Sequence, residues 1–201
     1  MTIPGHLLAA MALFAFVTSV TPGPNNMMLL SSGVNFGFLC SVPHMIGIST
    51  SHFVMLVSVG AGLEKIFQST PWFYSVMNVV GFMYLLYLAW GVAHAAAPSS
   101  EPNTTQQPMS YFQAVLFQWV NPKAWMMAVG YFTNYMPTDA PWSVIIPTCV
   151  MFSCINFLSV GVWAMMGRSL QNKLLNPIHR KRFNITMALL LVFSMIPVLF
   201  L

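Results

Sequence analysis

The sequence predicts an all-α polytopic membrane protein, with six transmembrane helices arranged as two inverted three-helix repeats in which helices 1 and 4 are broken. Three observations predict this class. The 201 residues are 57% hydrophobic and only 5% charged, against about 25% charged residues in an ordinary soluble domain. The apolar residues gather into six long runs, and prolines near positions 22 and 122 lie well inside two of these runs.

This composition excludes several classes of protein. Seven basic and three acidic residues are too few to solvate a soluble globule of this length, and the apolar content is too high for a disordered chain. The net charge of +4 is not arranged in a stripe, so we expect no nucleic-acid partner. The expected partner is the lipid bilayer, and we expect no enzyme.

The spans follow from the positions of the apolar runs, because about 20 apolar residues cross the hydrocarbon core as a helix. The first run has no basic residue before it and is longer than a signal peptide, so we interpret it as a retained helix. A polar segment with three prolines separates the third run from the fourth. The predicted spans cover about residues 6–32, 39–63, 71–93, 111–136, 141–167 and 183–201.

The spans divide the chain into two halves of three helices each. We expect a first repeat at residues 1–94, a cytoplasmic linker at 95–110 and a second repeat at 111–201. Because three is an odd number, the second repeat is inverted in the membrane relative to the first. Inverted repeats with a binding site at their interface are a recurring plan of secondary transporters.

Basic residues predict the orientation of these spans. Five of the seven lie between the fifth and sixth spans: Arg168, Lys173, Arg180, Lys181 and Arg182. Only Lys65 lies in any other loop. The positive-inside rule therefore places the base-rich loop in the cytoplasm, and counting back through the spans places both termini outside.

The first break lies near the middle of the first span and carries Thr21, Pro22, Gly23, Pro24, Asn25 and Asn26. Its prolines lack an N–H, so the carbonyls of Thr18 and Val20 lose helical partners, and its glycine permits angles that other residues avoid. Freed carbonyls in hydrocarbon cost several kcal/mol unless a partner meets them. The asparagines begin a new half-helix, whose positive N-terminus suits a carboxylate. The alternative is a packing kink.

The second break lies about 100 residues later, in the fourth span, and carries Asn121, Pro122 and Lys123. Its proline frees the carbonyl of Gln118. Lys123 is the only charge near the middle of a span, where an unpaired lysine costs about 2.5–3.5 kcal/mol. No span holds an acid that could pair with it. Unless it snorkels to an interface, Lys123 needs a polar cavity, freed carbonyls or an anionic ligand.

These motifs resemble those of a known family. The stretch TPGPNNMMLLSSGVNFGF at residues 21–38, continued by SVPHMIG at 41–47, is similar to the signature of the LysE/RhtB-type amino-acid exporters. The NPK break at 121–123 resembles that family's fourth-helix motif, and residues 81–90 resemble its third helix. The resemblance covers essentially the whole chain. It implies secondary-active export of a small amino acid or derivative across the bacterial cytoplasmic membrane.

The breaks and the resemblance together predict an exporter of a small zwitterionic solute that alternates access around a midplane site. The half-helix starting at Asn25 and the ammonium of Lys123 would hold the substrate carboxylate, and freed carbonyls would accept from its amino group. Rocking of one three-helix half against the other would expose the site to each side. A transporter of a metal ion or other small ion on the same scaffold is the alternative.

Three further polar residues within the spans are candidates for a functional role. His44 and His52 can titrate near physiological pH, so each is a candidate for proton coupling; the alternative is a histidine hydrogen-bonded to a neighbouring helix. They stand about 80° apart around an ideal helix, so we expect no shared metal, and no cofactor. Asn156 either lines the pathway or joins helices. The sequence does not indicate the amino acid carried, the coupling ion or whether the chain forms a homodimer.

Overall fold

A computed structural model describes the chain at residues 3–62, 71–94, 107–137 and 140–199. Within these ranges the chain forms eight α-helices, one short 3-10 helix and no strand. The three acids, Glu64, Glu101 and Asp139, lie outside the described residues, as does the predicted linker from residue 95 to residue 106.

The helices follow the predicted spans closely. They are α1 (Gly5–Val20), α2 (Pro24–Phe36), α3 (Phe38–Gly60), α5 (Pro71–Ala93), α6 (Tyr111–Val120), α7 (Pro122–Tyr135), α8 (Trp142–Gln171), η1 (Asn172–Leu174) and α9 (Pro177–Leu199). The first predicted span corresponds to α1 and α2, and the fourth to α6 and α7, so the helix is interrupted at both expected places. Helices α8 and α9 continue into the base-rich segment that we expected to be a loop, because Arg, Lys and Gln are good helix formers.

Length and apolar composition identify some of these helices as membrane spans. The segments Phe38–Gly60 and Trp142–Leu174 can each cross a membrane, and α1 with α2 forms a third candidate, bent by 57° at the first break. Helix α5 contributes a shorter apolar helix at Val79–Ala93. The fold is therefore all-helical and consistent with a polytopic membrane protein, while the number of six spans stays a prediction.

Prolines begin both inner half-helices. Pro24 is the first residue of α2 and Pro122 is the first residue of α7, a position where the missing N–H has no helical partner to lose. The residue before each proline is extended, as proline requires: Gly23 has φ −176° and ψ 179°, and Asn121 has φ −87° and ψ 106°. The expectation that Gly23 is needed for its unusual angles is wrong, because any residue adopts this conformation.

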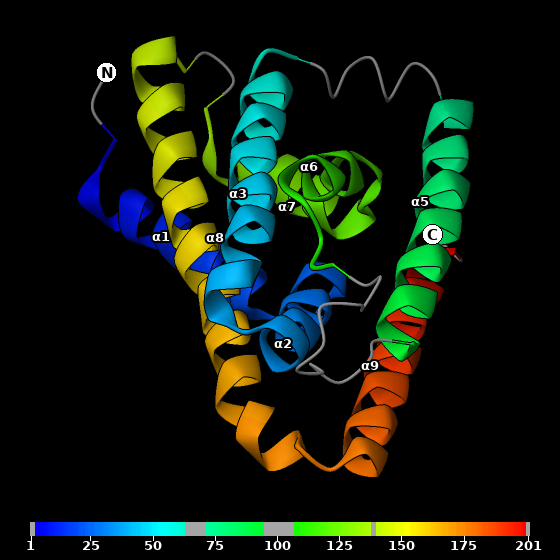
Figure 1. Cartoon of the computed structure of the whole chain (residues 1–201). Coiled ribbons are helices and arrows are strands. Elements are labelled where there is room, and N and C mark those ends of the chain that lie inside the picture. Colours follow the sequence, from blue (N-terminus) through cyan, green and yellow to red (C-terminus); the bar gives the residue numbers. More distant parts are fainter. Residues whose placement is uncertain (1–2, 63–70, 95–106, 138–139, 200–201) are drawn as a thin grey trace.

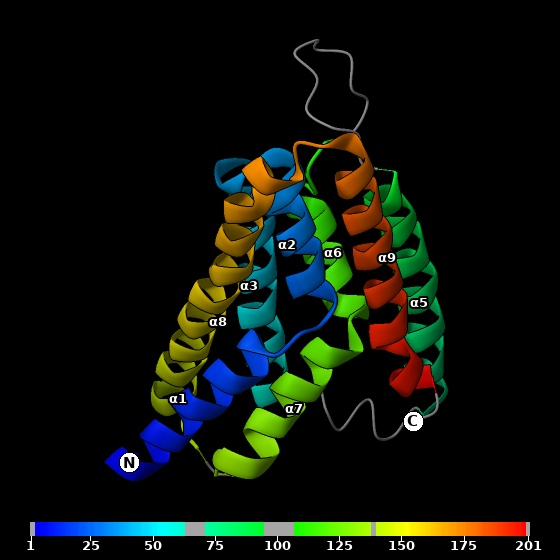
Figure 2. The same cartoon turned by 90° about the horizontal axis from the view of Figure 1, so that it is seen from below.

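The helices of the two halves alternate in the bundle rather than forming two separate bundles (Figure 1). Helix α5 packs against α9, α3 packs against α6 and α8, and α2 packs against α8. Figure 2 shows α1 and α7 running from the breaks toward one end of the bundle, while α2 and α6 run toward the other. The start of α1 and the end of α9 lie at the same end, opposite the connection between α8 and α9.

Two glycines, Gly33 and Gly167, allow α2 and α8 to approach each other closely. A Cβ atom on Gly33 would lie 2.9 Å from the backbone nitrogen of Arg168 and 3.0 Å from the Cα of Gly167, and a Cβ on Gly167 would meet the backbone of Leu30. These neighbours are backbone atoms, which cannot move aside as a side chain can. Small residues are the usual means by which membrane helices approach this closely. The crossing fixes the position of α2, and with it the first break, against α8.

Candidate functional site

The two helix breaks lie against each other between the two ends of the bundle. The Nζ of Lys123 donates a hydrogen bond to the carbonyl of Thr21 and a longer one, of 3.4 Å, to the carbonyl of Pro22. The Nδ2 of Asn25 donates to Oε1 of Gln118 at 2.8 Å. The lysine of the second break therefore donates hydrogen bonds to backbone carbonyls of the first break.

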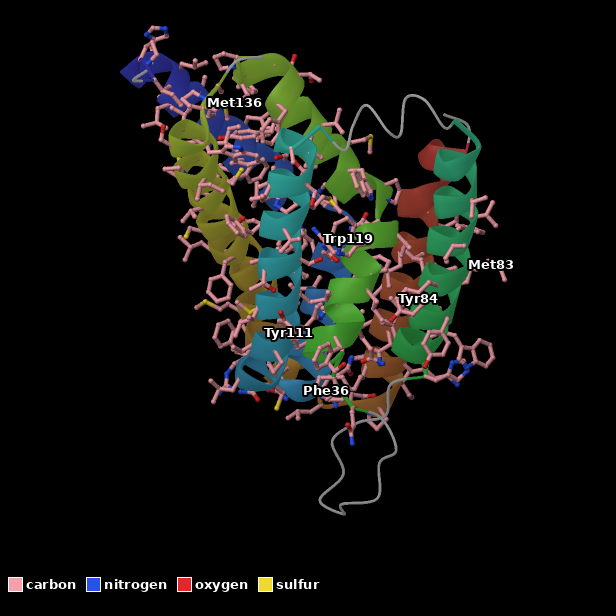
Figure 3. All side chains as sticks on the ribbon, turned by 90° about the horizontal axis from the view of Figure 1, so that it is seen from above. Phe36, Met83, Tyr84, Tyr111, Trp119 and Met136 are labelled. Carbon is pink, nitrogen blue, oxygen red and sulfur yellow. The ribbon has the colours of Figure 1, made fainter. Side chains whose placement is uncertain are left out.

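Figure 3 places this meeting point along the bundle. Trp119, just before the second break, lies between Met136 at one end and the pair Phe36 and Tyr111 at the other. Phe36 ends α2 and Tyr111 begins α6, so both half-helices run from the breaks to the same end. The breaks consequently lie between the two ends of the bundle, with Thr21 and Pro22 exposed at its surface.

Asparagine side chains hold the backbone of each break. The Nδ2 of Asn26 donates to the carbonyls of Ser19 and Thr21, at 2.9 and 2.8 Å. The Oδ1 of Asn121 accepts from the backbone N–H of Lys123 at 3.1 Å, which makes Asn121 the N-cap of α7. The amides thus satisfy backbone groups that the interrupted helices leave open.

Two carbonyls that we expected to be free for a substrate are occupied. The carbonyl of Val20 accepts from the indole Nε1 of Trp163 at 3.1 Å, and the carbonyl of Gln118 accepts from the backbone N–H of Asn121 at 3.3 Å. The first partner comes from α8, and the second results from a tighter last turn of α6. Each of these two carbonyls therefore already accepts one hydrogen bond before a substrate amino group arrives.

A small cavity lies between the breaks. Its volume is about 20 Å³, enough for a single water molecule. The predicted residues that line it are Gly23, Asn25, Asn26, Asn121, Lys123 and Asn156. The other predicted residues contribute differently: Thr21 and Pro22 supply the carbonyls that Lys123 contacts, and Pro24 and Pro122 begin the half-helices.

The cavity combines a cation with an open acceptor. None of the residues described by the structure is an Asp or Glu, so Lys123 has no carboxylate partner among them. The Oδ1 of Asn25 is buried and has no hydrogen-bond partner among the residues that the structure describes. A Cβ atom on Gly23 would lie 2.8 Å from Cδ and 3.0 Å from Nζ of Lys123. Glycine is therefore the residue that leaves room for the lysine side chain.

Asn156 joins helices and also borders the cavity, while its role in a transport pathway stays a prediction. Its Nδ2 donates to the hydroxyl of Ser19 on α1 at 3.1 Å, and its Oδ1 accepts from the hydroxyl of Ser49 on α3 at 3.3 Å. The side chain is 4% exposed and lines the same cavity as Lys123. Asn156 thus connects α8 to the first break.

The two histidines lie apart from the central cavity. Both are fully enclosed, at 1% exposure for His44 and 0% for His52, and no ring nitrogen of either has a hydrogen-bond partner within the described ranges. The expected hydrogen bond to a neighbouring helix is thus not found there. The ring of His52 packs edge-on against Phe152, with centroids 4.9 Å apart. No group of three or more His, Cys, Asp or Glu in the described chain could hold a metal ion.

Some residues of the site were missed by the sequence analysis. Ser19 and the side chain of Gln118 line the cavity, and Trp163 holds the first break. Gln118 stands three residues before Asn121, one helical turn away on the same face. This spacing could have predicted that its side chain lines the cavity. Nothing in the sequence indicates that Trp163, more than 100 residues further on, reaches Val20.

Comparisons with known proteins identify the family of this chain. The cysteine/O-acetylserine efflux protein of Escherichia coli (strain K12) is 26% identical over 196 residues, which cover 96% of this chain and 98% of the relative. The protein of the same name from Salmonella typhimurium (strain LT2) is 25% identical over 195 residues, with the same coverage. No solved structure gives a significant match. The family model described as LysE type translocator matches residues 16–199, and the chain therefore belongs to the LysE-type translocator family.

Proposed function

We propose that this protein is a secondary-active exporter that carries a small zwitterionic amino acid, or an amino-acid derivative, out of the bacterial cytoplasm. The observation that carries the proposal is the contact of Lys123 with the carbonyls of Thr21 and Pro22 across the two helix breaks. The names of the relatives, cysteine/O-acetylserine efflux proteins, support an amino-acid type of substrate.

The substrate binds between the breaks with its two charged groups held separately. Its carboxylate forms an ion pair with the ammonium of Lys123. This ion pair replaces the weaker hydrogen bonds from the ammonium to the backbone carbonyls. The nearby N-terminus of α2, which begins at Pro24, adds partial positive charge. The substrate ammonium donates to the open Oδ1 of Asn25. Asn156 borders the same space and completes its polar wall.

The packing supports six spans arranged as two inverted repeats, 1–94 and 111–201. Matching the helices in order pairs α1–α2 with α6–α7, α3 with α8, and α5 with α9. Two contacts of the first half then have counterparts in the second: α2 with α8 matches α7 with α3, and α1 with α8 matches α6 with α3, while the pairs α3 with α8 and α5 with α9 are each their own counterpart. A two-fold axis in the membrane plane produces such a pattern.

We propose a form of alternating access in this bundle that differs from the rocking of two halves expected from the sequence. Rocking of a whole repeat would separate α2 from α8 and α5 from α9, which pack extensively across the repeats. The backbone contact at Gly33 and Gly167 resists that separation. We therefore propose that the half-helices around the breaks, α2 included, move relative to the α5–α9 pair. During this movement α2 stays packed against α8.

The base-rich end of the bundle faces the cytoplasm in this proposal. The connection between α8 and α9 carries Lys173 and is flanked by Arg168 and Arg180, and the positive-inside rule places such segments in the cytoplasm. Both chain ends lie at the opposite end (Figure 2) and face outward. The protein is then a multi-pass protein of the bacterial cytoplasmic membrane.

The test is efflux from a bacterial host that expresses the protein and is loaded with single amino acids, including cysteine, O-acetylserine and lysine. We expect faster efflux of at least one amino acid with an uncharged side chain, lost in Lys123→Met at equal membrane levels. Lys173→Met, at the surface, is the matched control and keeps the activity. If the inserted protein exports none of the amino acids, the proposal is wrong and a transported ion is favoured.

A further inference from the structure

We infer that the protein has a second substrate site, a vestibule open to the cytoplasm that receives the amino acid before it reaches the central cavity. This inference rests on the proposed function. A cavity of about 690 Å³ lies between α2, α3, α5 and α6, within the range of small-molecule pockets. The central cavity, at about 20 Å³, is too small in this conformation for an amino acid. The vestibule is therefore the space in which a solute fits.

The vestibule lies at the base-rich end and adjoins the central cavity. Its lining includes Phe36, which Figure 3 shows at that end of the bundle. Along α2, Asn25 lines the central cavity, and Met28, one turn further, lines the vestibule. Along α6, Gln118 lines the central cavity and Gln113 the vestibule. The two spaces thus follow one another along the same pair of half-helices.

A narrow barrier separates the two spaces. It consists of the 2.8 Å hydrogen bond from Asn25 to Gln118 and the apolar cluster that contains Met28 and Phe117. Because Asn25 and Gln118 also line the central cavity, a solute arriving from the vestibule can take over their hydrogen bond as it enters. Transfer between the sites therefore needs this amide pair to open, together with a movement of the half-helices that enlarges the central cavity.

His44 is the feature of the vestibule that points to a ligand. Its side chain is 1% exposed, lines the vestibule, and has no hydrogen-bond partner at either nitrogen within the described residues. Other polar side chains of the lining are engaged: Ser32 with Ser41 at 2.8 Å, and Asn35 with Asn184 at 3.0 Å. Neutral imidazole carries one donor and one acceptor. Neither nitrogen is paired within the described residues, so both can bond to a solute that reaches the ring.

The chemistry of the lining selects the ligand class. The described residues that line the vestibule include no Lys, Arg, Asp or Glu, so a net charge on the solute meets no counter-charge among them. A zwitterion is neutral overall, and its carboxylate can accept from the imidazole N–H or its ammonium can donate to the other ring nitrogen. Tyr87, Trp90 and Met28 provide apolar surface for the remainder of the solute. The ligand is thus an amino acid with an uncharged side chain.

The test is protection of a reporter cysteine in the full-length protein. Cys40, Cys149 and Cys154 are replaced by serine or alanine, and Ser110→Cys, which lines the vestibule, is labelled with an impermeant maleimide in inside-out vesicles. O-acetyl-L-serine at ten times its dissociation constant slows the labelling about tenfold, and L-lysine does not. Ser169→Cys, exposed outside the vestibule, is the matched control and is not protected.

Two further variants separate this inference from the proposed function. Protection of Ser110→Cys persists in Lys123→Met, which lacks the central site, and is lost in His44→Leu but retained in His44→Gln, which keeps a donor and an acceptor. Transport of O-acetyl-L-serine is measured in the same vesicles. Transport without protection overturns the vestibule site and leaves the exporter standing, as does protection that disappears in Lys123→Met. Absence of transport and protection together overturns both.

Discussion

Gly23→Ala perturbs the central site selectively, because the atoms nearest to the added methyl group belong to Lys123. The backbone of Gly23 is extended, at φ −176° and ψ 179°, so alanine adopts it without strain. The three atoms nearest to an added Cβ all belong to Lys123: Cδ at 2.8 Å, Nζ at 3.0 Å and Cε at 3.4 Å. A lysine side chain is flexible, so we expect it to move while the protein folds normally.

The size of the effect follows from these distances. Carbon atoms in contact lie about 3.5–4.0 Å apart, so the added methyl group displaces the lysine by about 1 Å. The displaced Nζ of Lys123 loses good geometry to the carbonyl of Thr21 and to a substrate carboxylate. A hydrogen bond to a charged group contributes about 1.5–3 kcal/mol. Its loss lowers kcat/KM for transport about 10- to 150-fold.

The assay is the initial rate of amino-acid uptake into proteoliposomes that contain equal amounts of purified protein. Thermal unfolding of each variant is measured beside it, and we expect Gly23→Ala to unfold close to the wild-type temperature. Gly5→Ala is the control, because a Cβ on Gly5 meets no atom within 4 Å, and its transport should equal that of the wild type.

A double-mutant cycle decides whether the loss acts through the lysine. If Gly23→Ala works by displacing Lys123, the double variant with Lys123→Met transports no worse than Lys123→Met alone, since the displaced group is already absent. Losses that multiply in the double variant, or wild-type transport by Gly23→Ala, would refute the reasoning.

Three other substitutions test the supports of the site. Gly33→Ala forces α2 away from the backbone of Ala164; we expect a loss of about 1–3 kcal/mol, seen as a lower unfolding temperature in detergent, and an unchanged temperature would contradict the close crossing. Trp163→Phe leaves the carbonyl of Val20 without its 3.1 Å partner; transport should fall at equal protein levels, and unaltered transport counts against this support. Asn156→Ala removes two hydrogen bonds worth about 0.6 kcal/mol each; transport should fall more than stability, whereas equal losses would assign it to packing alone.

Much of the fold could be predicted because apolar runs and scarce charges constrain a membrane chain strongly. With 5% charged residues, the position of each charge carried information, and Lys123 was identified by having no partner within the spans. Pro24 and Pro122 marked the starts of the inner half-helices because proline cannot continue a helix from the previous turn. Both signals are local and need no knowledge of packing.

Contacts between distant helices could not be predicted in the same way. The occupation of the Val20 carbonyl by Trp163 depends on how α8 crosses the first break. The role of Gly23 was assigned to backbone freedom, whereas the structure shows that it provides space for Lys123. His44 was a candidate for proton coupling, and only the packing of three other helices around it shows the vestibule that it lines. Each of these depends on tertiary geometry rather than on spacing.

The most direct test of the account is equilibrium binding of radiolabelled amino acid, such as O-acetyl-L-serine, to purified wild-type protein and to Lys123→Met. The central claim is that the two breaks form the substrate site through Lys123. The high-affinity component of binding should weaken about 10- to 150-fold in Lys123→Met, and Lys123→Arg should recover part of it because the charge is kept. Wild-type affinity in Lys123→Met would contradict the claim.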